Sequence, residues 1–206
     1  MTGANHGWRT LEIPIRPGIG TPTHCPWGHN LEVGGVRQSW SQDYHAPEWL
    51  CEACHALPAR GGLWAQIDPT PARHVTEDQV DEYGLRLVLL RPPTPAGIGA
   101  IQLRLGHTIF GEVQLSLCPI DRRAILVHIE IEEKHRRRGA GSVLVAAAAA
   151  RGPRYQWTTL PIDRDPTSIA FWARTGAPGP AAPHPCTHQL GQGVVPAESR
   201  WTKRWW

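Results

Sequence analysis

The sequence predicts an α+β fold with a mixed, mostly antiparallel sheet, preceded by a small module stabilised by a metal. Three observations predict it. Between residues 85 and 131, four strand-like segments follow one another at short spacing. After Ile131 the pattern changes to a glycine-containing turn and an alanine-rich helix. Finally, two Cys/His pairs lie within the first 60 residues, at a spacing that suits a metal.

Composition sets the broad class. The chain has 206 residues, and its 41% hydrophobic content is enough for a packed core. The net charge of +3 is nearly balanced, so it does not by itself indicate a nucleic-acid-binding protein. No apolar run approaches the roughly 20 residues that cross a bilayer, and no signal-like segment begins the chain. We therefore expect a cytoplasmic protein without a membrane partner.

Three regions are expected along the chain. Residues 1–60 form a zinc-ribbon-like module that contains half of the Cys and His residues, residues 61–75 form a linker punctuated by Gly and Pro, and residues 76–206 form the α+β domain. A module of this size buries little core, so we expect a metal to contribute to its stability.

Two short segments of the first region are candidate metal ligands. Cys25 and His29 flank one tight turn, and Cys51 and Cys54 flank another. Four N/S ligands from two turns are typical of a structural, tetrahedral Zn²⁺ site. A hairpin is expected between the turns, over residues 31–40. Three other histidines are alternatives to His29: His24, His45 and His55. The competing interpretation is three buried or free cysteines with incidental histidines.

The α+β domain is read element by element from its periodicity. Strands are expected at residues 85–90, 100–105, 112–117, 124–131 and 155–160. Helices are expected at residues 139–151, where Gly152-Pro153 ends the helix, and from Asp165-Pro166 to Gly176, where Asp165 is the cap. Two weaker expectations are a short helix within residues 76–83 and a late strand at Val194-Val195.

The turn after the last long strand reads Arg136-Arg-Arg-Gly-Ala-Gly141. A glycine turn that opens a helix presents unpaired backbone N–H groups and the positive end of the helix dipole, which suits a phosphate. The arginines add charge and paired donors. The turn is neither a Walker loop nor a Rossmann fingerprint, and the competing interpretation is an Arg-rich surface loop that caps a helix.

In this strand–turn–helix context, Arg136-x-x-Gly139-x-Gly141 resembles the turn of the GNAT acetyltransferases, and Ser168 to Gly176 is similar to a later motif of that family. The resemblance implies the GNAT fold, with acetyl-CoA between splayed fourth and fifth strands and its pyrophosphate on the backbone of residues 138–142. The implied acetyl-CoA-binding residues are Ile129, Ile131, Arg136, Arg137, Arg138, Gly139, Ala140, Gly141, Ser142, Ser168 and Phe171.

The sequence also departs from that family. Trp172 stands where the family commonly has a Tyr that protonates the leaving thiolate, and Ala177 follows Gly176 in place of Phe. The two helices that usually follow the first strand are not evident. Glu130 is the candidate catalytic base, with Glu132 and Glu133 as alternatives, and Tyr155 is a candidate replacement acid. His128 is expected on another side of the strand from Glu130.

We therefore expect an acetyl-CoA-dependent N-acetyltransferase that acts on an unidentified amine, peptide or protein. The alternative is a non-catalytic acetyl-CoA-binding protein that contacts protein or nucleic acid through the zinc ribbon and the Trp/Arg tail. Few arginines in the ribbon disfavour nucleic acid. Cys118 is expected to be a buried thiol. His184, Cys186 and His188 could bind a second metal, but the sequence shows no fourth ligand at a sensible spacing.

Overall fold

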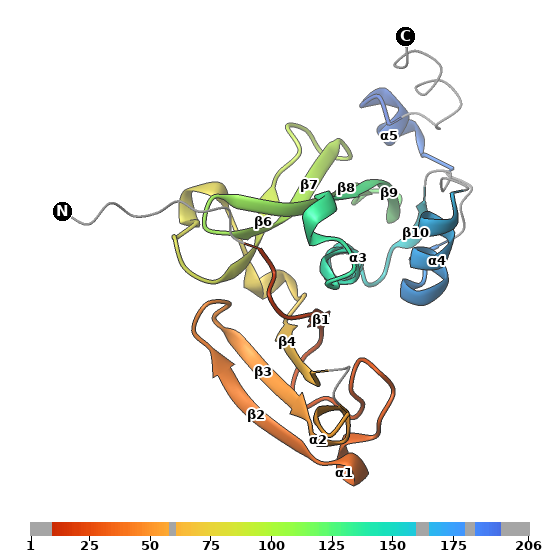
Figure 1. Cartoon of the computed structure of the whole chain (residues 1–206). Coiled ribbons are helices and arrows are strands. Elements are labelled where there is room, and N and C mark those ends of the chain that lie inside the picture. Colours follow the sequence, from red (N-terminus) through yellow and green to blue (C-terminus); the bar gives the residue numbers. More distant parts are fainter. Residues whose placement is uncertain (1–9, 58–60, 160–164, 180–183, 195–206) are drawn as a thin grey trace, which may run out of the picture.

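The computed structural model describes residues 10–57, 61–159, 165–179 and 184–194, and it contains two mixed sheets (Figure 1). The first sheet has the strand order β1-β4-β3-β2, with β1 at Ile15–Pro17, β4 at Leu63–Ile67, β3 at Ala46–Cys51 and β2 at Val36–Ser41. Strand β1 runs parallel to β4, and the other two pairs are antiparallel.

The second sheet has six strands in the order β10-β9-β8-β7-β6-β5. They are β5 (His74–Val75), β6 (Leu85–Leu90), β7 (Ile98–Leu105), β8 (Thr108–Cys118), β9 (Arg123–Ile131) and β10 (Gln156–Thr159). The central strands form an antiparallel meander, while β10 and β5 are parallel to their neighbours. This confirms the expected strands and the mixed, mostly antiparallel sheet; residue 160 lies outside the described residues.

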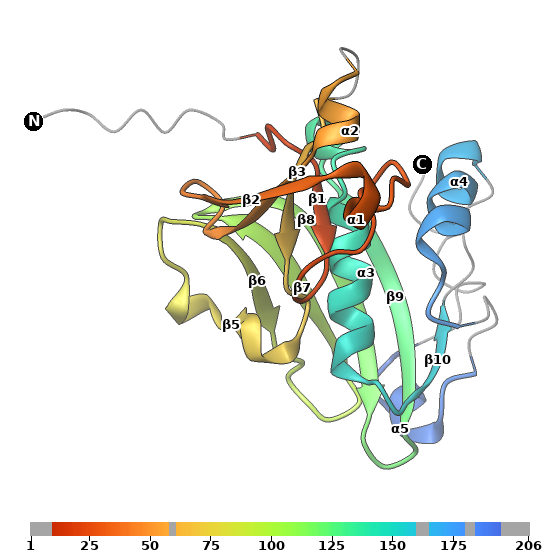
Figure 2. The same ribbon diagram turned by 90° about the horizontal axis from the view of Figure 1, so that it is seen from below.

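Three helices belong to the second sheet: α3 (Ala140–Arg151), α4 (Pro166–Thr175) and α5 (Thr187–Gly191). Helix α3 lies across one face of the sheet, and α4 lies beside β10 (Figure 2). The small side chains of α3 let it approach the sheet closely, and Gly152 ends it as expected. The side chain of Asp165 caps α4 by accepting hydrogen bonds from the N–H groups of Thr167 and Ser168. None of the described helices is long and apolar enough to cross a membrane.

Two expectations about the first half of the chain and one about its end need correction. Residues 31–40 are not a hairpin, because Asn30 caps a short helix, α1 (Leu31–Gly34), before β2 begins; the hairpin is β2–β3. Residues 76–83 contain only a 3-10 turn at Glu77–Gln79. At the late strand, Val194 has no strand assignment and Val195 is outside the described residues.

The segment expected to be a linker, residues 61–75, contains β4 and β5. Strand β4 lies between β1 and β3, so this part of the chain is the centre of the first sheet. Its apolar residues also reach the main core. Ala65 and Ile67 of β4, with Ile15 of β1, belong to the same buried cluster as Leu103 of β7 and Leu144 of α3. The two sheets therefore share one hydrophobic core.

Candidate functional site

The four predicted metal ligands lie together at the end of β3. The ligand atoms of Cys25, His29, Cys51 and Cys54 are all within 4.8 Å of one another. The sulfurs of Cys25 and Cys54 are 3.8 Å apart, and Nδ1 of His29 is 3.7 Å from the Cys51 sulfur and 3.1 Å from the Cys54 sulfur. Tetrahedral zinc has bonds of about 2.0–2.3 Å, which place its ligand atoms about 3.3–3.8 Å apart. The residues therefore fit a metal such as zinc.

Local structure explains why these side chains converge. The turn from Cys25 to His29 is closed by the Cys25 N–H bonded to the His29 carbonyl, at 2.9 Å. Cys51 ends β3, and Cys54 follows one turn later in α2 (Glu52–His55). Around the four ligands pack Trp27, Trp49 and Trp64, which exclude water from the thiols. The three alternative histidines, His24, His45 and His55, do not join the cluster in the described residues.

The pKa shifts of Cys25 and Cys54 indicate that the cluster needs a positive charge. Burial alone would raise the pKa of Cys25, but hydrogen bonds from the backbone N–H groups of Trp27 and His29 outweigh it and lower that pKa. At Cys54, burial and then the neighbouring sulfurs of Cys25 and Cys51 raise the pKa to about 12. The raised pKa of Cys54 disfavours its thiolate, and a bound divalent metal supplies the positive charge that stabilises a thiolate ligand.

The glycines of the Arg136–Gly141 turn are needed by the protein itself. A Cβ on Gly139 would lie 1.9 Å from the carbonyl oxygen of Ile15, because β1 packs directly on the turn and its Ile15 N–H bonds to the Arg138 carbonyl at 2.7 Å. A Cβ on Gly141 would lie 2.7 Å from the Phe171 ring of α4. Close approach to these glycines is therefore made by β1 and α4, although the sequence predicted approach by a ligand.

A cluster of cations surrounds the N-terminus of α3. Arg136, Arg137 and Arg138 are exposed in the turn, where Arg136 donates to the Ile131 carbonyl and Arg138 to the Glu12 carbonyl. Arg16 of β1 is half-buried close to Gly139, and burial together with the charge of Arg174 lowers its pKa. Among the residues that the structure describes, no carboxylate pairs with any of these arginines. The arrangement favours an anion.

Sequence reasoning missed Arg16 and Arg174. Nothing in the sequence near Arg16 indicated that the N-terminal segment would return to the turn, because the pairing of β1 with β4 spans about 50 residues. Arg174 lay inside a recognised helix, Pro166–Thr175, but its approach to Arg16 depends on the packing of α4.

Strand β10 is parallel to the first part of β9. The register runs from Arg123↔Gln156 to Leu126↔Thr159, where the described part of β10 ends. Opposite this point, the pairing of β9 with β8 shifts between Gln114 and Leu115, which is a β-bulge. Beyond this bulge, β9 continues through Ile129 to Ile131 and leads to the turn at the start of α3.

The candidate base, Glu130, lies on the sheet face opposite α3. Its side chain is 73% exposed, and its carboxylate is 3.8 Å from Nε2 of His128. The two residues are therefore on the same face, since residues i and i+2 of a strand share a face, and the expectation that His128 points elsewhere is wrong. The partner of Glu130 on β8 is Glu112, whose carboxylate accepts hydrogen bonds from the amides of Gln102 and Gln114.

The candidate acid, Tyr155, lies at the other end of β9. It stands in the turn between α3 and β10, where its N–H bonds to the Gly152 carbonyl. Because Gln156 pairs with Arg123, about seven residues or roughly 23 Å of strand separate this level from Glu130. One site cannot contain both side chains, so the structure does not bring the two candidate catalytic residues together.

The remaining predicted residues lie around α4. Phe171 and Trp172 are half-buried against the main core, with ring centroids 4.9 Å apart. Ser168 contributes its N–H to the Asp165 cap, one turn before Phe171. Ser142 reaches α4 at Thr175, with hydroxyl oxygens 3.3 Å apart. Helix α4 is thus held against the first turn of α3.

Two cavities of the described structure lie away from this turn. One, of about 400 Å³, lies between the sheets and is lined by Trp49 of β3 and Leu85 of β6. The other, of about 430 Å³, is lined by Pro92, Leu115 and Arg151. Neither cavity is lined by residues 136–142, which agrees with the packing of β1 and Phe171 against the turn.

Comparison with known proteins gives no assignment. No protein-family model matches the chain, and no curated protein matches it. Functional inference therefore depends on the residues and contacts described above.

Proposed function

We propose that this chain is an acetyl-CoA-dependent N-acetyltransferase that acts on an amine. One observation carries the proposal: β9, α3 and β10 form a β–α–β unit with parallel strands, and the N-terminus of its helix is surrounded by arginines that pair with no carboxylate of the described residues. Coenzyme A carries several phosphate charges, so a cationic helix N-terminus suits its pyrophosphate. The resemblance of Arg136-x-x-Gly139-x-Gly141 to the GNAT turn supports the same assignment.

The chemistry requires few side chains. A neutral amine attacks the thioester carbon, the C–S bond breaks, and the coenzyme leaves as a thiolate. A backbone N–H of β9 at Ile129 to Ile131 stabilises the oxyanion, and the ammonium proton passes to Glu130 or His128, directly or through water. Trp172 cannot protonate the thiolate, but a thiol pKa near ~8.5 makes that group a fair leaving group without an acid.

The test is thiol release from acetyl-CoA in the presence of a panel of amines, peptides and aminoacyl compounds. We expect slow release with a suitable acceptor. Glu130→Gln should lower the rate by about 10²-fold or more if Glu130 takes the proton. Glu48→Gln, on β3, is the matched control and should leave the rate unchanged. Trp172→Tyr should raise the rate or leave it unchanged. No release above background with any acceptor would contradict the enzyme.

A second candidate is a protein that binds acetyl-CoA without turnover, and a specific observation favours it. Strand β1 and Phe171 cover both glycines of the turn, and Trp172 supplies no acid. In that case the first sheet would provide a surface for a protein partner. Tight binding of acetyl-CoA with no thiol release would identify this candidate; the Trp/Arg tail lies outside the described residues.

The cluster of Cys25, His29, Cys51 and Cys54 is assigned to a structural Zn²⁺, since four protein ligands leave no open position for a reactant. Its role is to join the Cys25–His29 turn to the Cys51–Cys54 turn. Cys51→Ser should remove one metal ion per chain and loosen the first sheet, as read by elemental analysis and circular dichroism. Retention of the full metal content by this variant would contradict the assignment.

A further inference from the structure

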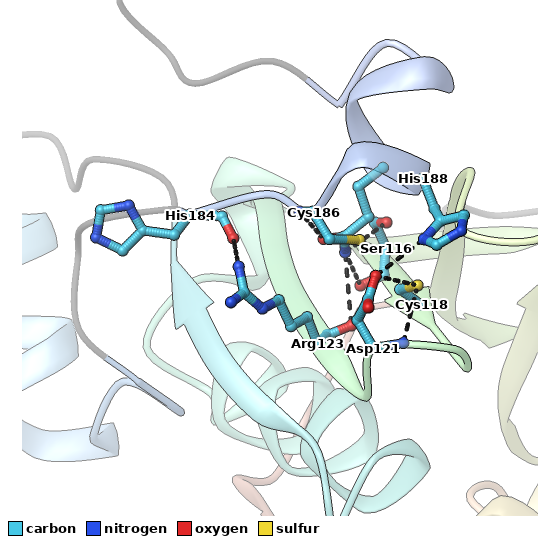
Figure 3. Close-up of polar contacts among 8 residues, drawn as sticks. Ser116, Cys118, Asp121, Arg123, His184, Cys186 and His188 are labelled. Carbon is cyan, nitrogen blue, oxygen red and sulfur yellow. Dashed lines mark hydrogen bonds and ion pairs between the residues drawn. The ribbon is translucent and has the colours of Figure 1, made fainter.

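A second group of metal-ligand side chains lies at the far end of the second sheet. It consists of Cys118 at the end of β8, Asp121 in the turn to β9, and Cys186 and His188 at the start of α5 (Figure 3). The ligand atoms of these residues are all within 4.8 Å of one another. From the sequence, Cys186 and His188 had no fourth partner at a sensible spacing. The fold supplies two partners from about 65 residues earlier in the chain.

The distances within the group are those of a ligand shell. The carboxylate Oδ2 of Asp121 is 3.6 Å from the Cys118 sulfur and 2.9 Å from Nδ1 of His188. The Asp121 N–H also points at the Cys118 sulfur, at 3.5 Å. Ligand atoms on tetrahedral zinc are about 3.3–3.8 Å apart, so only small shifts are needed to surround an ion.

The segment that contributes Cys186 and His188 is held in place by other contacts. Gln189 is fully buried, and its amide nitrogen donates to the Ser116 hydroxyl at 3.1 Å while its amide oxygen accepts the Cys186 N–H at 3.1 Å. Arg123 of β9 donates to the His184 carbonyl at 3.0 Å. Both halves of the group are therefore pre-positioned by the protein before any ion binds.

Burial and chemistry select the kind of ion. Cys118 is 0% and Cys186 is 8% exposed, and they pack with Ala96, whereas Asp121 and His188 are about 40% exposed. Two sulfurs, an imidazole and a carboxylate are a donor set for Zn²⁺ and not for Mg²⁺ or Ca²⁺, which prefer oxygen. The buried sulfurs form the floor of the site, and the two polar ligands close it on the solvent side.

The location of the group indicates what an ion would do. Ser116 and Cys118 alternate with Val113 and Leu115, which face α3 in the core, so α5 packs on the opposite face of the sheet. The contacts just described fasten residues 184–194 to this face at one end of β8 and β9. An ion bound by both sides would fix that attachment in the way a crosslink does.

We propose that Cys118, Asp121, Cys186 and His188 bind a second zinc ion, which clamps residues 184–194 onto the face of the six-stranded sheet opposite α3. The clamp is independent of the metal at Cys25, His29, Cys51 and Cys54 and of the proposed acetyl transfer. A disulfide between Cys118 and Cys186 is the competing arrangement, and it would leave Asp121 and His188 without a role.

Metal content per chain tests the proposal, measured by elemental analysis on full-length protein prepared with a reductant and dialysed against metal-free buffer. We expect two zinc ions in the wild type and the loss of one in Cys186→Ser and in His188→Ala. His184→Ala is the matched control, because its side chain points away from the cluster in Figure 3, and it should retain both ions. Cys51→Ser should retain one ion, and adding Cys186→Ser should remove it.

His188→Ala keeps the test decisive if Cys186→Ser does not fold, because it changes a side chain at the surface. Hydrogen exchange then gives a second readout: chelation of the wild type, or His188→Ala, should speed exchange of the α5 amides while α3 stays protected. The proposal is overturned if folded wild type contains a single ion that neither Cys186→Ser nor His188→Ala removes. It is equally overturned if mass spectrometry shows a Cys118–Cys186 disulfide that persists in reductant and excludes the metal.

Discussion

At the scale of single residues, Gly139 shows how a correct pattern can have a different physical cause. The sequence indicated that a residue without a side chain was needed at this position, and the structure agrees: the backbone φ is 95° and β1 lies against the Cα. The sequence could not show which neighbour imposes the requirement, because β1 comes from 120 residues earlier. Metal ligands were easier to predict, since each pair lies within one short turn.

Gly139→Ala should destabilise the fold strongly. The added Cβ would lie 1.9 Å from the Ile15 carbonyl, and L residues also resist a φ of 95°. Together these effects should cost about 3 kcal/mol or more. Gly176→Ala is the control, since its φ is 76° but nothing lies within 4 Å, and it should cost at most about 1–2 kcal/mol. Urea unfolding of both variants measures the difference; equal losses would contradict the packing of β1 on the turn.

His135 predicts a pH dependence of stability. The side chain is fully buried against Phe110 and has no hydrogen-bond partner in the described structure, and burial, with the charge of Lys134, lowers its pKa. In the unfolded chain the pKa is near ~6.5, so below that pH the unfolded state binds more protons. The free energy of unfolding should therefore fall as pH drops below about 6.5, by up to ~1.4 kcal/mol per pH unit.

In His135→Leu this contribution disappears, so its free energy of unfolding should change less between pH 7 and pH 5.5 than that of the wild type. Urea titrations of both proteins at the two pH values give the comparison. Equal pH dependence in the two proteins would show that His135 is not kept neutral by the fold.

At the scale of elements, the β9–α3–β10 unit was predictable because each of its signals is local. The alternation of β9, the glycine turn, the alanine run of α3 and the Gly152-Pro153 stop all lie within residues 123–159. The elements that failed are those with competing local signals: Asn30 caps a helix where a hairpin was expected. The attachment of α4 was also beyond prediction, because none of its residues is fully buried.

The cap of α4 should decide how firmly the helix is held over the turn. Asp165→Ala removes the acceptor for the N–H groups of Thr167 and Ser168 and should cost about 1 kcal/mol, which is roughly a fivefold rise in local opening. Asp165→Asn keeps a capping oxygen and is the control. Hydrogen exchange of the α4 amides should rise in the first variant alone; the same rise in both would mean that charge, and not capping, holds the helix.

At the scale of the whole molecule, the two sheets are not separable by their packing. Ile15 and Ala65 of the first sheet are buried in the same cluster as the residues beneath α3, and β1 completes the turn at Gly139. Contacts between segments that are far apart in the sequence stabilise this architecture: β1 with β4, β1 with the turn, and α5 with β8. Sequence periodicity reports on neighbours along the chain, so it predicted the elements and one metal cluster but not these long-range contacts. Of the second cluster, the sequence indicated Cys186 and His188, but with His184 in place of Cys118 and Asp121.

We propose that the cationic N-terminus of α3, at the end of β9, binds acetyl-CoA. Calorimetric titration of the full-length protein with acetyl-CoA tests it most directly. We predict one site per chain. Arg16→Ala and Arg174→Ala should each weaken binding by about 1.5–3 kcal/mol, or roughly 10- to 100-fold, because each removes a charged donor from the cluster. Arg37→Ala, which breaks a surface pair with Glu52, should bind like the wild type. The absence of binding at millimolar acetyl-CoA, or equal affinity in all four proteins, would contradict the account.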